Sequence, residues 1–142
     1  MSAAIDKAKS TTATPLRVRF CETDLMGVVH HATYLIYFEV GRVEWLRKRK
    51  ITYADWTARG VQVPVVEAQV QYRAPSRFDD LLSIETTLTK LRSVSLDYSY
   101  RIVCGATLVA EGSTRLACVD MNHKLLRIPE AIREALLAGE ST

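Results

Sequence analysis

The chain has 142 residues, of which 48% are hydrophobic and 25% are charged, and its formal net charge is +3 at neutral pH. This length suits one globular domain and is too short for two of ordinary size. The charge is mild and forms no basic block long enough to neutralise several phosphates, which argues against duplex DNA as a partner. No run of about 18 apolar residues is present to cross a membrane. We therefore expect a soluble cytoplasmic protein with neither nucleic-acid nor membrane partners.

Residues 1–14 are polar and rich in Ala, Ser and Thr, and we expect them to form a disordered lead-in to one domain over residues 15–142. They contain no apolar core of signal-peptide length. The three cysteines, Cys21, Cys104 and Cys118, are well separated and form neither a CxxC pair nor a disulfide framework. Reduced thiols in a reducing compartment are the expected state.

The first predicted strand covers residues 16–21, where apolar and basic side chains alternate. Residues 33–50 then predict one long helix, with Thr33 as its N-cap. Apolar residues cover so much of its circumference that it should be buried on more than one side. Gly41 weakens a helix, so we expect the backbone to pack closely against a neighbour there.

The second half of the chain predicts strands. The apolar phase changes between residues 61–65 and 68–72, beside Pro64, which indicates a bulge or a bend. The remaining predictions are strands at 84–88, 96–102 and 107–119, a hairpin turn at Gly105 and a short helix at 129–138. A strand, a long helix and three to four antiparallel strands predict an α+β fold, with the sheet wrapped around one long central helix.

The segment 20–34 joins the first predicted strand to the helix and holds the residues suited to chemistry. It places the carboxylates of Glu22 and Asp24 and the imidazoles of His30 and His31 near a helix N-terminus. Unpaired N–H groups there can stabilise a developing oxyanion. Hydrolysis of an activated acyl bond needs a base or nucleophile, a carbonyl polariser and a pocket, and this segment can supply them without a metal. Adjacent histidines do not easily share one metal ion, so we expect no metal site.

The run from Asp24 to Leu35, DLMGVVHHATYL, resembles the motif of the thioesterase family typified by 4-hydroxybenzoyl-CoA thioesterase. The resemblance extends over roughly residues 16–122. It implies a hot-dog fold and hydrolysis of an acyl-CoA thioester, with coenzyme A as part of the substrate and no separate cofactor. It also implies a homodimer or homotetramer. An acyl carrier protein in place of coenzyme A stays open, as does the acyl group.

Position by position, the resemblance implies roles for four residues. Asp24 matches the family's catalytic aspartate, which acts as a nucleophile or as the base for water. His31 matches a position whose backbone N–H polarises the thioester carbonyl. Lys90 and Arg92 lie where relatives often hold the phosphates of coenzyme A. Phe20 stands where some relatives carry an assisting Tyr, so we do not expect a hydroxyl-dependent mechanism.

Other interpretations remain for these residues and for the function. Asp24 could be a loop carboxylate that accepts backbone N–H groups, His31 could be structural, and the segment 90–93 could be a solvated hairpin. Glu67 is the second candidate for the catalytic carboxylate. A hydratase or dehydratase of acyl thioesters commonly pairs an Asp with a His five residues later, whereas Val29 follows Asp24 at that distance. A non-catalytic acyl-CoA-binding protein is the other alternative.

Overall fold

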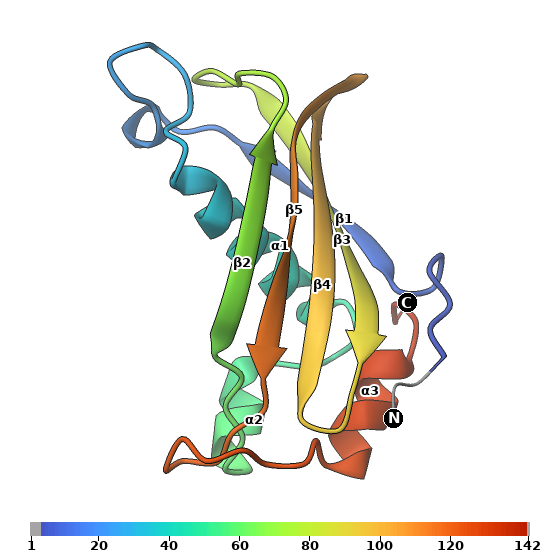
Figure 1. Ribbon diagram of the computed structural model, residues 1–142. Helices are drawn as coiled ribbons and strands as arrows, with labels where there is room; N and C mark the ends of the chain where they lie inside the picture. The colour runs from blue at the N-terminus through green and yellow to red at the C-terminus, as the bar shows by residue number, and fades with distance from the viewer. Residues whose placement is uncertain (1–3, 142) are drawn as a thin grey trace.

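The structure is a computed structural model that describes residues 4–141. Five strands form one antiparallel sheet in the order β1-β3-β4-β5-β2, and the longest helix, α1, lies against one face of it (Figure 1). The α+β class with an antiparallel sheet is as predicted. The elements are β1 (Thr11–Arg17), the 3-10 turn η1 (Phe20–Glu22), α1 (Thr33–Arg47), α2 (Tyr53–Ala58), β2 (Val65–Tyr72), β3 (Leu81–Leu91), β4 (Ser95–Cys104), β5 (Thr107–Ala117) and α3 (Glu130–Leu137).

Strand β1 begins at Thr11, so the prediction of disorder up to residue 14 is wrong for the last four of those residues, while residues 1–3 lie outside the described part. All seven residues of β1 pair with β3 in antiparallel register. Thr12 and Thr14 are buried, and β-branched threonines suit extended backbone. The partner strand lies about 70 residues later in the chain, so local composition gave no sign of this pairing.

The segment after β1 also differs from the prediction, because the strand expected to reach Cys21 ends at Arg17 and is followed by η1. A local hydrogen bond closes this turn: Glu22 Oε1 accepts the backbone N–H of Arg19 at 2.8 Å. The alternation of basic and apolar residues is therefore interrupted by a side chain that competes for the backbone N–H groups of an extended strand.

Helix α1 begins at Thr33 as predicted and ends at Arg47, three residues earlier than expected. Thr33 is its first residue and not its N-cap, because the cap position is Ala32 and no side chain bonds there. Gly41 provides the predicted close approach: a Cβ at this position would lie 2.7 Å from Ile84 Cγ2 on β3, and closer still to Thr86 Oγ1. The missing side chain thus lets α1 approach the sheet.

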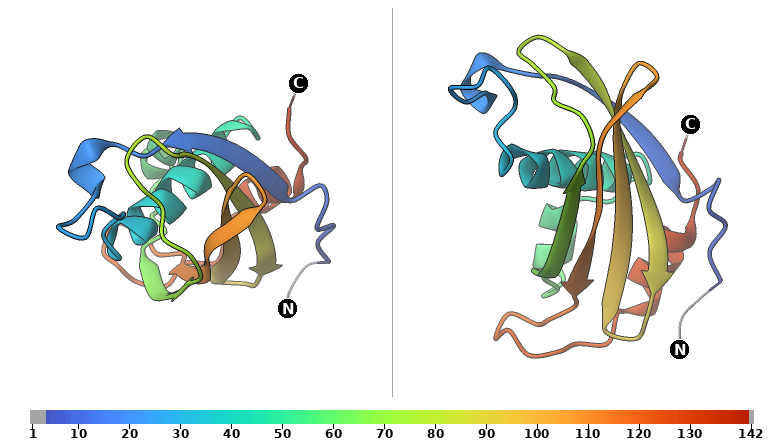
Figure 2. Two further views of the ribbon diagram at one scale, coloured as in Figure 1. Left: turned by 90° about the horizontal axis from the view of Figure 1, so that it is seen from above. Right: turned by 45° about the horizontal axis from the view of Figure 1, so that its top comes forward.

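Strand β2 is the edge strand that borders the functional region. Its register against β5 shifts between Val65 and Glu67, so the predicted irregularity beside Pro64 is confirmed. Most of its residues are exposed, and within residues 4–141 its outer edge pairs with no other strand. Seen from above, the sheet curves so that α1 lies between the edge strands β1 and β2 (Figure 2). None of the described helices is long and apolar enough to span a membrane.

Candidate active site

The loop between η1 and α1 holds Asp24 in a tight turn. The carboxylate oxygen Oδ1 of Asp24 accepts the N–H of Met26, and the backbone carbonyl of Asp24 accepts the N–H of Gly27, both at 2.9 Å. Gly27 has a φ of 75°, a left-handed conformation that glycine adopts without a steric penalty. The second carboxylate oxygen, Oδ2, has no hydrogen-bond partner within residues 4–141. Asp24 therefore shapes the turn with one oxygen and presents the other to water or substrate.

Five consecutive amides lead into the N-terminus of α1, and four of them are already hydrogen-bonded. The bonds run from the N–H of Val29 to the carbonyl of Ser76 (2.8 Å), from His30 to the carbonyl of Glu22 (2.9 Å), from Ala32 to Nδ1 of His30 (3.1 Å) and from Thr33 to the carbonyl of His30 (2.9 Å). The His31 N–H is the fifth, and the described part of the chain provides no acceptor for it. A free N–H at the start of a helix is a suitable donor to developing negative charge.

Asp24 and His31 line the same cavity, which has a volume of about 200 Å³. The other lining residues are mostly apolar and come from the loop, from α1, from the end of β2 and from the segment after it: Met26, Val28, Val29, Tyr34, Tyr72, Ala74 and Pro75. The Tyr72 ring meets the rings of Tyr34 and His31 edge-on, at centroid distances of 5.6 and 6.5 Å. The structure thus brings together both predicted catalytic residues. Tyr72 could not be assigned to this site from the sequence, because its strand lies far along the chain.

Glu22, the other carboxylate of this loop, is engaged elsewhere. Only 10% of its side chain is exposed, and it accepts the hydroxyl of Tyr37 at 2.9 Å and pairs with Arg19 at 3.0 Å. Burial opposes ionisation of this carboxyl, but the donors of Arg19 and Tyr37 outweigh it, so the pKa of Glu22 is lowered. Glu22 therefore ties η1 to α1 and is not one of the cavity residues.

Lys90 and Arg92, predicted to bind coenzyme A, lie at the opposite end of the sheet from Asp24. The β3–β4 turn that holds Arg92 is at one end of the molecule and the loop 20–31 is at the other (Figure 1). Strand β3 alone spans 11 residues, which corresponds to roughly 33 Å at about 3.3 Å per residue. Within one chain, the two predicted parts of the site therefore remain separate.

Arg92 is committed to an ion pair, whereas Lys90 is exposed. The Arg92 guanidinium donates to both carboxylate oxygens of Asp97 at 3.0 Å, and Arg115 bonds the same carboxylate. Burial opposes ionisation of Asp97, but the two arginines outweigh it and lower its pKa. Arg115 also pairs with Glu67 at 3.6 Å. Glu67, the second candidate carboxylate, is therefore part of a network of ion pairs with Arg115 and Asp97 and does not line the Asp24 cavity.

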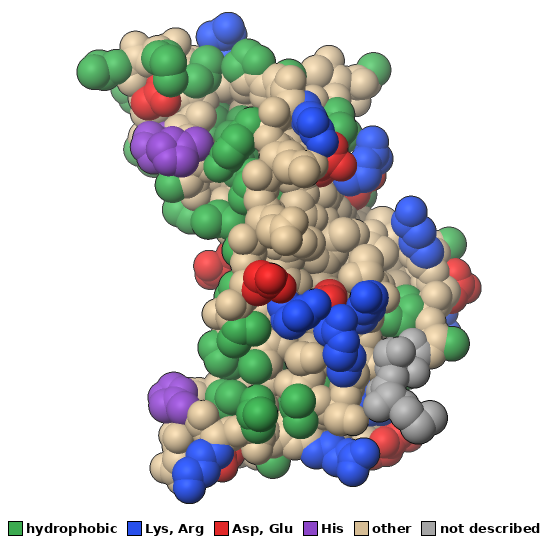
Figure 3. Space-filling view, in the orientation of Figure 1, with side chains coloured by type: hydrophobic (Ala, Val, Ile, Leu, Met, Phe, Trp, Pro, Cys, Tyr) green, Lys and Arg blue, Asp and Glu red, His purple; other side chains and the backbone are tan. Residues whose placement is uncertain are grey.

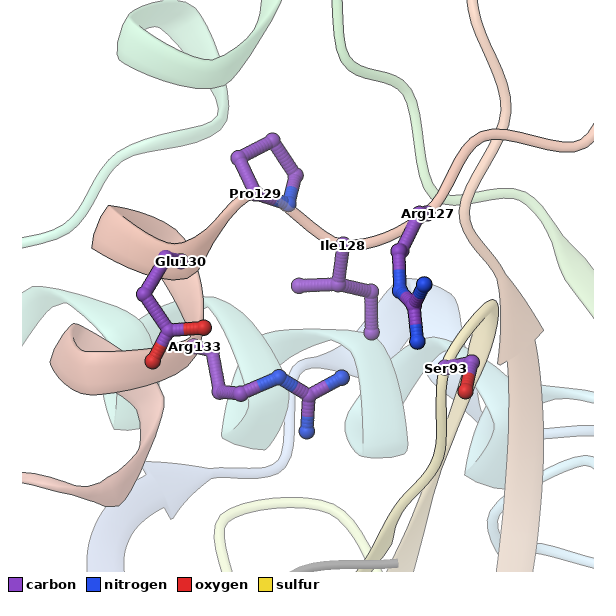
Figure 4. A pocket seen from close by; sticks show the side chains of 6 residues that line it. All are labelled: Ser93, Arg127, Ile128, Pro129, Glu130 and Arg133. Atoms are coloured by element: carbon purple, nitrogen blue, oxygen red, sulfur yellow. The ribbon is translucent and has the colours of Figure 1, made fainter. Parts of the chain in front are cut away.

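A larger cavity of about 460 Å³ lies beside the β3–β4 turn (Figure 4). It is lined by Ser93, Arg127, Ile128, Pro129, Glu130 and Arg133. The guanidinium groups of Arg127 and Arg133 lie on the same side as the Ser93 hydroxyl, and Arg133 Nη2 donates to the carbonyl of Arg92 at 2.7 Å. Two guanidinium groups and a hydroxyl suit phosphate oxygens, with Glu130 as the opposing charge in the lining.

Arg127 and Arg133 were not predicted from the sequence as site residues. The sequence feature that could have indicated them is one arginine on each side of Pro129, at the start of a short helix. Lys and Arg side chains also gather over the half of the sheet nearer this cavity (Figure 3).

Side chains that bind metals do not converge in the described part of the chain: no three of His, Cys, Asp and Glu lie close enough to hold an ion. His30 and His31 stack on each other, with ring centroids 4.3 Å apart.

Among the cysteines, Cys21 is exposed and Cys118 is buried, and burial raises the pKa of the Cys118 thiol.

Comparison with known proteins gives consistent matches over most of the chain. The profile of the thioesterase-like superfamily matches residues 18–136. The acyl-CoA thioester hydrolase YbgC of Escherichia coli O6:H1 is 38% identical over 120 residues, which cover 83% of this chain and 90% of that protein.

Solved structures agree with these matches. The structure of the protein TT1821 from Thermus thermophilus superimposes with a TM-score of 0.84 at 42% identity, over 89% of this chain and 95% of that one. A DHNA-CoA thioesterase from Staphylococcus aureus superimposes with the same TM-score at 29% identity, over 88% and 87%.

Proposed function

This chain belongs to the thioesterase-like superfamily and is an acyl-CoA thioester hydrolase, and from that premise we propose that cleavage takes place in the cavity shared by Asp24 and His31. One observation carries the proposal. Asp24 and His31 line the same mostly apolar cavity, and within residues 4–141 the Asp24 oxygen Oδ2 and the His31 backbone N–H have no hydrogen-bond partner. α1 is then the central helix of a hot-dog fold, with its N-terminus directed to the reacting carbonyl.

In this mechanism the thioester carbonyl oxygen accepts the His31 N–H, which stabilises the negative charge that develops on it. Asp24 Oδ2 either attacks the carbonyl carbon or takes a proton from the attacking water. The carbon–sulfur bond breaks, the thiolate of coenzyme A leaves and takes up a proton, and water supplies the second oxygen of the acid. Oδ1 keeps its bond to the Met26 N–H, so the turn holds the carboxylate in place during the reaction.

The two roles of Asp24 are distinguished by a single turnover in H₂¹⁸O with enzyme in excess over acyl-CoA. A nucleophilic Asp24 forms a mixed anhydride as the thiolate leaves, and attack of water on the enzyme's own carbonyl then leaves ¹⁸O in Asp24, so label in Asp24 identifies the nucleophilic role. A general base delivers solvent oxygen directly to the acid. Mass spectrometry of the peptide that contains Asp24 and of the acid reads the result.

The thiol-release assay with a panel of acyl-CoA substrates tests the function itself. We propose that no metal and no separate cofactor take part, so the rate should be the same with and without EDTA. Loss of the rate in EDTA and its return with zinc would overturn this part of the proposal. The same panel, extended to an acyl carrier protein substrate, identifies the preferred thiol and acyl group. The cytoplasmic location stays a prediction.

We also propose that the protein acts as a homodimer or homotetramer. The exposed edge of β2 offers unpaired backbone groups to a second copy. Antiparallel pairing of two β2 edges around a two-fold axis would set the Asp24 end of one chain beside the Arg127 end of the other. The phosphates of coenzyme A would then meet Ser93, Arg127 and Arg133, with Lys90 near the end of β3 and Arg92 in the adjoining turn, while the thioester reaches Asp24.

A further inference from the structure

Tyr72 is the last residue of the exposed edge strand β2, and it reaches across to the loop before α1. The residue is 52% exposed, yet its hydroxyl donates to the backbone carbonyl of His31 at 3.0 Å. The two residues are 41 positions apart in the chain. Such a long-range bond from an exposed tyrosine to the main chain indicates a role in addition to covering apolar surface.

The peptide group that accepts this bond is held at both ends by side chains. Its carbonyl, from His31, accepts the Tyr72 hydroxyl, and its N–H, from Ala32, donates to Nδ1 of His30 at 3.1 Å. The His30 ring in turn stacks on the His31 ring, with centroids 4.3 Å apart. Rotation of this peptide plane is thus restrained by Tyr72 at the carbonyl and by His30 at the N–H.

These bonds hold His31, the residue whose backbone N–H is free in the described structure. His31 is the only residue of the run 29–33 whose N–H has no acceptor in the described structure. Its N–H and its carbonyl lie on either side of the same Cα, so a bond to the carbonyl restricts the backbone angles that aim the N–H. A donor held in a fixed position stabilises an oxyanion far more than a mobile donor does.

We infer that Tyr72 is a positioning residue, whose hydroxyl fixes the backbone of His31 so that the His31 N–H is aimed at the thioester carbonyl oxygen. This inference rests on the proposed role of the His31 N–H. The ring of Tyr72 has a separate contribution as part of the cavity wall, where it meets Tyr34 and His31 edge-on. The hydroxyl acts on turnover, and the ring acts on binding.

Tyr72→Phe separates these contributions, because it removes the hydroxyl and keeps the ring. We expect kcat to fall about tenfold, the effect of losing one hydrogen bond that matters in the transition state, with KM within about twofold of wild type. Tyr53→Phe is the matched control: its hydroxyl, on α2, bonds Arg42 Nε at 3.3 Å and does not touch the cavity. It should leave kcat unchanged.

The backbone amides give a second measurement that does not depend on turnover. In ¹⁵N-labelled protein, Tyr72→Phe should shift the resonances of His31 and Ala32 and speed exchange of the Ala32 amide proton, whereas Tyr53→Phe should leave them unchanged. Thermal melting checks that both variants are folded.

Each outcome decides the inference. Lower kcat with altered amides supports it. Unchanged kcat overturns it, as does a higher KM alone, which would make Tyr72 only a wall of the pocket. Lower kcat without any change in the amides also overturns it, because Tyr72 would then act on the substrate directly. Wild-type turnover in Asp24→Asn would instead overturn the proposed mechanism and leave the amide measurement on Tyr72 standing.

Discussion

At Asp24, charge and shape can be separated by one substitution. Asp24→Asn keeps an oxygen to accept the Met26 N–H, so the turn should survive. The charge and the basic lone pair are lost, and a positioned base contributes about 10²–10⁴-fold. We expect kcat to fall by at least about a hundredfold, with KM little changed and stability within ~1–2 kcal/mol of wild type.

A matched control for this substitution is Asp120→Asn. Asp120 also closes a turn, since its Oδ1 accepts the N–H groups of Asn122 and Lys124 at 2.8 and 3.1 Å, but it lies outside the Asp24 cavity. It should keep wild-type kcat. Near wild-type turnover in a folded Asp24→Asn variant would make Asp24 structural, and Glu67→Gln would be the next variant to assay.

Glu22 contributes to stability in a way that depends on pH. Its pKa is lowered in the folded protein from an ordinary value of 4.5. The ionised form therefore stabilises the fold above that value, and this contribution is lost as the pH falls through the folded-state pKa. We expect Glu22→Gln to lower the free energy of unfolding at neutral pH. On acidification, the free energy of unfolding should decrease less in this variant than in the wild type.

Urea unfolding at neutral pH and at about pH 3 measures both differences. Glu44→Gln is the control, because Glu44 forms an exposed pair with Arg47 at 3.1 Å, and such pairs contribute about 0–1 kcal/mol. Equal losses on acidification in wild type and Glu22→Gln would show that Glu22 is not the group responsible.

The contact between α1 and β3 depends on the absence of a side chain at Gly41. An alanine there would place its Cβ 2.7 Å from Ile84 Cγ2 and nearer to Thr86 Oγ1. Overpacking of this kind destabilises by about 1–3 kcal/mol, which exceeds the gain in helix propensity of about 1 kcal/mol. Gly41→Ala should therefore lower the melting temperature.

The double variant Gly41→Ala with Thr86→Ala identifies the cause. The Thr86 hydroxyl is buried without a partner in the described structure, so its removal relieves the closest contact and strands no hydrogen bond. The double variant should be more stable than the sum of the single effects, as for residues in contact. Additive losses would place the strain elsewhere.

The segment before α3 holds Arg127, which we propose to contact the phosphates of coenzyme A. We expect Arg127→Ala to raise KM for acyl-CoA more than it lowers kcat, since contacts far from the reacting carbonyl bind substrate and transition state alike. A truncated thioester of N-acetylcysteamine has no phosphates, so the variant and wild type should hydrolyse it equally.

Arg101→Ala, which removes an exposed arginine paired with Glu85 at 2.8 Å, is the control for general charge effects. The double variant Lys90→Ala with Arg92→Ala tests the residues first predicted for this role. A wild-type KM for Arg127→Ala together with a raised KM for the double variant would place the phosphates at the β3–β4 turn instead.

For the whole molecule, we expect light scattering to give the mass of two or four chains of 16.0 kDa. Leu35 and Ile36 on α1 and Val65 and Val66 on β2 are exposed, and these two elements contact each other. Ile36→Asp should yield monomers with little activity. Leu125→Asp, which places the same charge on an exposed leucine elsewhere, should keep the assembly. A wild-type monomer with full activity would contradict the shared site.

Features that depend on neighbouring residues could be predicted from the sequence. Asp24 and His31 lie in the same short loop, so their proximity followed from chain order, and their pattern identified the family. The start of α1, the close approach at Gly41 and the irregularity of β2 were also readable, because each reflects local backbone chemistry.

Contacts between residues far apart in the chain could not be predicted and became visible only in the folded protein. The pairing of β1 with β3, the bond from Tyr72 to His31 and the cavity of Arg127 beside the β3–β4 turn join segments tens of residues apart. The tertiary structure also sets Lys90 and Arg92 at the end of the sheet away from Asp24. Periodicity and composition describe each segment's own conformation and carry no information on its partner, because strand pairing and packing are interactions between segments.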